Sequence, residues 1–189
     1  MKGEYIAKEM ENEKLKQYLI EFVEETLNEC DLFSRIYGKD FVRQRLEQNL
    51  KQVCTGIYSE TSNGWYDFFE KSITLCSETK KAKPVTVAQI KRSEEKKQLI
   101  LHESVHAVFA RTKDECDERG IALGTGMVEE YHNETELGRA LNEGLTEWIC
   151  EKAGYKSQTY ENEVNAIKTQ KGIRRNVPWK QGAFLVENL

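Results

Sequence analysis

The sequence has no large excess of either charge, no long apolar run and no closely paired cysteines. Its 28 lysines and arginines nearly balance 32 acidic residues, for a net charge of −4, so neither nucleic acid nor a membrane is expected as a partner. No apolar run approaches the ~20 residues of a membrane span, and residues 1–19 lack the apolar core of a signal peptide. These absences predict a cytoplasmic protein.

The five cysteines are odd in number and widely spaced, and no two form a C-x-x-C pair. This pattern fits neither a disulfide framework nor a structural zinc knuckle. We therefore expect buried, reduced thiols at Cys30, Cys54, Cys76, Cys116 and Cys150. Any bound metal should then be held by histidine and carboxylate side chains.

A length of 189 residues suits one domain with a single core. We expect an α+β fold, mostly helical and zincin-like, with a small mixed or antiparallel sheet. Within the single domain of residues 1–189 we predict N-terminal helices over 1–55, a core over 56–155, and a C-terminal helix with a basic tail over 156–189.

The N-terminal part shows helical spacing of its apolar residues. An amphipathic helix is predicted over 8–30, with charged residues on the face opposite the apolar stripe. A second helix is predicted over 40–54, with Asp40 as its N-cap.

The pattern changes to strands over residues 55–76, which are rich in aromatic and β-branched side chains. The Ser-Asn-Gly turn at 62–64 breaks this stretch, which predicts a hairpin or a meander. Residues 71–76 form its best strand, whereas 85–90 suit either a short strand or a helical turn.

Three further helices are predicted in the second half of the chain. One covers 94–111, with Ser93 as its N-cap, and is apolar on most sides, so we expect it to be buried. A glycine-rich loop over 118–135 leads to a helix over 135–154 that stops at its final glycine, and the last helix covers 160–171.

His102 and His106 stand four residues apart with Glu103 between them. On a helix this spacing places both imidazoles on one face, where they can bind one ion, and neutral imidazole suits zinc. Glu103 is rotated about 100° from His102, so it flanks the ion and can exchange a proton with a metal-activated water. The alternative, two hydrogen-bonded histidines in a buried helix, leaves the Glu103 carboxylate without compensation.

A third ligand is available from Glu143 and Glu147, again four residues apart on a predicted helix. Two glutamates at this spacing are usually a solvated helix face. The helix around them is strongly apolar, which favours a role at a buried metal instead. Spacing alone leaves either carboxylate able to complete the site.

The motifs HESVH at 102–106 and NEGLTE at 142–147 together resemble those of the gluzincins, the zinc metallopeptidases typified by thermolysin and the one-zinc aminopeptidases. The resemblance covers about residues 65–155. It implies a zincin fold, a zinc cofactor, a peptide or protein substrate, and hydrolysis of a peptide bond. It also implies that the strand over 71–75 pairs with an extended substrate.

The resemblance further implies a role for each motif residue. His102, His106 and Glu143 hold the zinc, and Glu103 is the catalytic general base. Glu147 supports a ligating histidine without binding the metal. In toxin-type relatives either acid of such a helix can ligate, so Glu147 is also the reserve third ligand.

The chain departs from the family in two respects. The stretch between the two motifs is longer than in thermolysin, so a loop must be accommodated there. No motif marks the residue that stabilises the tetrahedral oxyanion, for which His132, Tyr155 and Tyr160 are the candidates.

Two other functional hypotheses stay open. One is a non-catalytic zinc-binding module, with a regulatory or protein-interaction role, that retains the zincin core. The other is a helical scaffold without metal. The sequence leaves the cleavage specificity, endo- or exopeptidase action and the oligomeric state undetermined.

Overall fold

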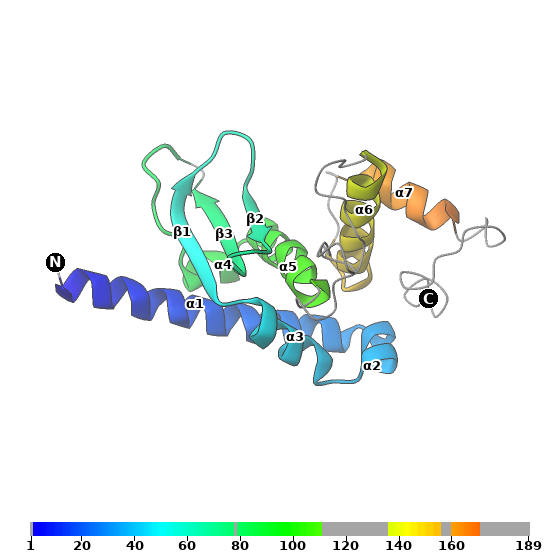
Figure 1. Ribbon diagram of the computed structural model, residues 1–189, viewed down its shortest axis with the longest axis horizontal. Coiled ribbons are helices and arrows are strands. Elements are labelled where there is room, and N and C mark those ends of the chain that lie inside the picture. Colours follow the sequence, from blue (N-terminus) through cyan, green and yellow to red (C-terminus); the bar gives the residue numbers. More distant parts are fainter. Residues whose placement is uncertain (1, 78, 111–135, 156–159, 171–189) are drawn as a thin grey trace.

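The computed structural model describes residues 2–77, 79–110, 136–155 and 160–170. The predicted α+β class is confirmed, because the chain combines helices with one small mixed sheet (Figure 1). In these ranges no helix combines the length and apolar character needed to cross a membrane.

The N-terminal part forms three helices: α1 (Lys2–Glu29), α2 (Asp31–Tyr37) and α3 (Phe41–Asn49). Helix α1 buries an apolar stripe and packs against α3, β1 and α5. Helix α2 was not predicted, and it ends at Gly38, whose φ of +79° favours glycine. Asp40 is the N-cap residue of α3, as predicted, but its side chain makes no capping hydrogen bond.

The sheet contains β1 (Gln52–Tyr58), β2 (Gly64–Asp67) and β3 (Ser72–Ser77) in the order β1-β3-β2. Strands β2 and β3 form a hairpin within the predicted stretch, but its turn covers 68–71 and not the Ser-Asn-Gly break at 62–64. Strand β1 runs parallel to β3, so the sheet is not a meander. Residues 52–54, predicted as the end of a helix, belong to β1.

The prediction that residues 71–75 pair with substrate is wrong. Residues 72–75 of this stretch fall in β3, whose two edges are already occupied by β1 and β2. Strands β1 and β2 are the two edges of this sheet, and β2 packs against α5. The outer side of an edge strand has backbone groups that another chain can pair with.

Two capped helices follow the sheet, α4 (Val87–Arg92) and α5 (Glu94–Phe109). Thr86 and Gln89 form a capping box at the start of α4, which resolves 85–90 as mainly helical. The Ser93 hydroxyl accepts a hydrogen bond from the Lys96 N–H, so the predicted N-cap of α5 is confirmed.

The C-terminal helices are α6 (Glu136–Lys152) and α7 (Glu161–Gln170). Just beyond α6, Gly154 has a φ of +91°, as expected for the predicted helix stop. Gly144 lets α7 pack closely on α6, since a Cβ there would lie 2.9 Å from the Glu163 backbone. The predicted loop over 118–135 and the basic tail over 171–189 lie outside the described residues.

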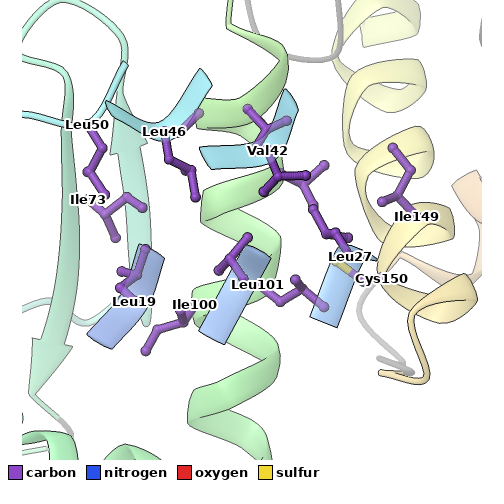
Figure 2. Packing of buried hydrophobic residues seen from close by; sticks show 14 of the residues in the cluster. Leu19, Leu27, Val42, Leu46, Leu50, Ile73, Ile100, Leu101, Ile149 and Cys150 are labelled. Atoms are coloured by element: carbon purple, nitrogen blue, oxygen red, sulfur yellow. The ribbon is translucent and has the colours of Figure 1, made fainter. Parts of the chain in front are cut away.

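The core lies where α1, α3, α5, α6 and the sheet meet (Figure 2). Leu101 of α5 and Ile149 of α6 are both buried in it, so the two helices that carry the sequence motifs share one apolar interior. Cys76 and Cys150 are buried as predicted, whereas Cys30 and Cys54 are only half-buried; all four are free thiols, and Cys116 lies outside the described residues.

Side chains from α3 hold the C-terminal end of α5. The last carbonyls of a helix have no partner within the helix. Asn49 Nδ2 donates to the carbonyl oxygens of Ala107 and Ala110, at 3.0 and 2.7 Å. Arg45 donates to the carbonyls of Val108, at 3.0 Å, and Ala110. These bonds fix the end of the helix that carries both histidines.

We predict that Asn49→Ala lowers the free energy of unfolding by about 2 kcal/mol, because two buried carbonyls lose a donor. The loss is limited because the variant also removes Asn49 Oδ1, which has no partner among the described residues. Urea denaturation measures the change. The control is Gln44→Ala, at an exposed position of the same helix, and an equal loss in both variants would contradict the prediction.

Candidate metal centre

Helices α5 and α6 bring the two sequence motifs into direct contact. His102 and His106 project from adjacent turns of α5, and their Nε2 atoms lie 3.2 Å apart. From α6, Glu143 Oε2 lies 3.0 Å from His102 Nε2 and 3.5 Å from His106 Nε2. Three metal-ligating atoms therefore form a small triangle between two helices.

The size of this triangle matches a tetrahedral metal site. Zinc binds nitrogen and carboxylate oxygen at about 2.0 to 2.2 Å, so tetrahedral ligand atoms lie about 3.3 Å apart. The three observed separations, 3.0, 3.2 and 3.5 Å, are close to that value. Two imidazoles and one carboxylate also form the donor set of zinc sites that keep a fourth position open.

Glu147 contacts the opposite nitrogen of the same imidazole. Its Oε2 lies 3.0 Å from His102 Nδ1, and Gln98 Nε2 donates to its Oε1 at 3.2 Å. The Glu147 side chain is 2% exposed, whereas that of Glu143 is 19% exposed. Glu143 therefore faces the open side with the Nε2 atoms, while Glu147 fixes the His102 ring from behind by accepting its Nδ1–H.

Two supporting residues were missed from the sequence. Thr146 Oγ1 lies 3.4 Å from His106 Nδ1, where it can accept a hydrogen bond when Nε2 binds a metal. Gln98, which holds Glu147, precedes His102 by four residues. Helical spacing could have identified both residues, because each lies one helical turn from a proposed ligand: Gln98 from His102 and Thr146 from Glu143.

Glu103 lies next to the triangle but outside it. Burial raises the pKa of its carboxyl, and the charges of His102 and His106 oppose the rise only in part. The carboxylate accepts a hydrogen bond from the Tyr66 backbone N–H, in edge strand β2. The sheet thus holds Glu103 in a buried position beside the ligand atoms.

The contacts with the two glutamates favour the protonated, positively charged form of His102. Burial alone would lower the pKa of His102, but hydrogen bonds with Glu143 and Glu147 outweigh it and raise that pKa to about 10. Burial would raise the pKa of Glu143, but His102 and His106 lower it well below its usual range. Both shifts favour a positive charge on the imidazoles beside a negatively charged Glu143.

A second group, His102 with Glu147 and Cys150, also brings ligating atoms together. Burial raises the pKa of the Cys150 thiol well above its ordinary value. Cys150 and Glu147 are also almost fully buried, so this group has no open side for a substrate. The triangle with Glu143 is the better metal site.

The three candidates for the oxyanion-stabilising residue have different surroundings. Tyr160, at the start of α7, stacks on the His102 ring with centroids 5.6 Å apart. Tyr155 instead packs edge-on against Phe22. His132 lies outside the described residues. Of the described candidates, Tyr160 is the one in contact with a proposed ligand.

No protein-family model, curated protein or solved structure matches the chain. The function must therefore be inferred from the residues of the site themselves.

We expect Glu143→Ala and Glu147→Ala to weaken zinc binding to different extents. Removing Glu143 deletes a ligand, so the affinity should fall more than 100-fold; removing Glu147 deletes only the support of His102, for which losses of about 10- to 100-fold are typical. Competition with a chromophoric chelator measures both affinities. A larger loss of zinc affinity in the Glu147 variant would indicate that Glu147 is the metal ligand and Glu143 the supporting residue.

We predict that zinc binding at pH 7 releases at least one proton. The pKa of His102 near 10 means that the metal-free imidazole carries both protons at pH 7, whereas a ligand must free its Nε2. Apparent affinity should therefore rise about tenfold per pH unit between roughly pH 7 and 10. Titration calorimetry in buffers of different ionisation enthalpy counts the protons, and a heat independent of the buffer would contradict the prediction.

Proposed function

We propose that this protein is a zinc-dependent peptidase of the gluzincin type, which hydrolyses a peptide bond with Glu103 as general base. The observation that carries the proposal is the triangle of His102, His106 and Glu143, which has tetrahedral edge lengths. The buried carboxyl beside it supplies a base that a purely structural zinc site does not need.

The proposed ligands would hold the ion at the meeting point of α5 and α6. When bound, zinc supplies a Lewis acid that lowers the pKa of water and polarises a carbonyl. His102 is fixed for this task by Glu147 on its other nitrogen, and His106 is adjacent to Thr146. Both imidazoles thus keep Nε2 on the side that Glu143 faces.

Glu103 is suited to take a proton and return it. Burial raises the pKa of its carboxyl toward the working pH, where a general base and acid is most efficient. The Tyr66 N–H fixes its orientation. Glu103 would accept the proton of the attacking water and then donate it to the leaving amine.

The edge of β2 that pairs with no other described strand is the proposed place of the substrate backbone, in place of β3. An extended peptide can add to a sheet edge by main-chain hydrogen bonds. Because Tyr66 of β2 contacts Glu103, a peptide along this edge would bring its bonds close to the proposed base. This arrangement favours a peptide over a small compact substrate.

We expect Glu103→Gln to retain zinc and to lower kcat for peptide hydrolysis by about 10²- to 10⁴-fold, the usual contribution of a general acid–base residue. Metal analysis and kinetics on a broad library of quenched fluorescent peptides measure the two effects. Glu94→Gln, at an exposed position in the first turn of α5, is the matched control and should behave as wild type.

Three results would count against the proposal in different ways. Equal rates of hydrolysis by wild type and Glu103→Gln would show that Glu103 is not the general base. Zinc bound tightly by a wild type that cleaves no peptide would favour the non-catalytic zinc module. Absence of metal in protein prepared with excess zinc would exclude both the zinc peptidase and the non-catalytic zinc module.

A further inference from the structure

Tyr160, which immediately precedes α7, contacts the proposed metal centre. Its ring stacks on the His102 imidazole, with the centroids 5.6 Å apart and the two planes inclined by 13°. Both values suit an offset stack of two aromatic rings, for which centroids about 4.5 to 7 Å apart are usual. Tyr160 therefore contacts the flat face of the imidazole and leaves both ring nitrogens to other partners.

The other contacts of the His102 ring lie at its edge. Glu147 contacts Nδ1 and Glu143 contacts Nε2, each at 3.0 Å. A hydrogen bond at a ring nitrogen is close to linear and so runs near the plane of the ring. These two bonds resist movement of the imidazole within its plane better than movement perpendicular to it. Tyr160 blocks one of the two perpendicular directions.

Helix α7 is anchored along α6, so the position of Tyr160 is fixed (Figure 1). A Cβ at Gly144 of α6 would lie 2.9 Å from the α7 backbone. Val164 of α7 is 2% exposed, and its N–H donates to the Tyr160 carbonyl at 2.9 Å. Further along, Lys168 Nζ lies 2.7 Å from Glu151 Oε2. Tyr160 is therefore held by the first turn of a helix that packs on the ligand-bearing helix.

We propose that Tyr160 is a positioning residue, whose ring holds the His102 imidazole in place for zinc and slows release of the ion. Release requires a ligand to move away from the metal, and His102 cannot move toward α7 while Tyr160 stacks on it. This inference rests on the zinc site of the proposed function and is independent of peptide hydrolysis. It makes the start of α7 a part of the metal centre.

This role differs from the oxyanion-stabilising role for which Tyr160 is a candidate. Stabilising an oxyanion requires a hydrogen-bond donor, here the hydroxyl, whereas stacking requires only the aromatic ring. Tyr160→Phe removes the first and keeps the second. Under this proposal the phenylalanine variant releases zinc as wild type does, whatever happens to its rate of hydrolysis.

The test measures the rate at which zinc leaves the 189-residue chain. Zinc-loaded protein is mixed with a large excess of chelator, and release is followed with a zinc-sensitive dye. Tyr160→Leu keeps apolar bulk but lacks a flat ring, so it should release zinc about 3- to 10-fold faster than wild type, as loss of one aromatic pair provides. Tyr160→Phe should stay within about twofold of wild type. Tyr160→Ala serves if the leucine variant does not fold.

Two control variants test whether a looser α7 is sufficient for the effect. Val164→Ala removes buried apolar contacts of α7 and keeps the Tyr160 ring. It should lower the free energy of unfolding but change the zinc release rate by less than about twofold. Asn162→Ala, at an exposed position of α7, should change neither. Release from Val164→Ala as fast as from Tyr160→Leu would show that packing of α7, and not the ring, controls the ion.

The outcomes separate this inference from the proposed function. Faster release from Tyr160→Leu but not from Tyr160→Phe supports the positioning role, whether or not wild type cleaves peptides. Equal release rates from wild type and both variants overturn that role and leave the peptidase function standing. Equally fast release from both variants assigns the effect to the hydroxyl and also overturns the role of the ring. A wild type that binds no zinc overturns both proposals.

Discussion

The contact between His102 and two glutamates, one on each ring nitrogen, is the constraint on which the rest of this structure depends. It places ionisable groups in an interior where an unpaired charge is costly. The contact is favourable only if α5 and α6 keep their relative position, since each helix supplies one side of it. A cation between these side chains, whether proton or metal, stabilises the same arrangement.

The elements around the site hold α5 at both ends. Ser93 caps its N-terminus, and Arg45 and Asn49 of α3 bind the carbonyls at its C-terminus. On the other helix, Gly144 stands beside the proposed ligand Glu143 and lets α7 approach. A glycine in a helix is unfavourable by about 1 kcal/mol relative to alanine, and here the close packing of α7 gives a reason for its presence.

Much of the site could be predicted from the sequence because helical periodicity acts over four residues. It placed His102 and His106 on one face, and both glutamates on another. It could not distinguish Glu143 from Glu147, because only the crossing of α5 and α6 determines which carboxylate meets Nε2. The strands show the same limit: composition identified residues 71–76 as a strand, but the central position of β3 in the sheet depends on pairing with β1, which begins about 20 residues earlier.

Tyr66 gives the site an unusual kind of robustness. The group that orients Glu103 is its backbone N–H, while its hydroxyl donates to the Asn49 carbonyl at 2.8 Å. A backbone donor is present in every amino acid except proline. Most substitutions of Tyr66 would therefore remove the hydrogen bond to α3 but keep the backbone hydrogen bond to Glu103. The orientation of the proposed base does not depend on which side chain stands at this position.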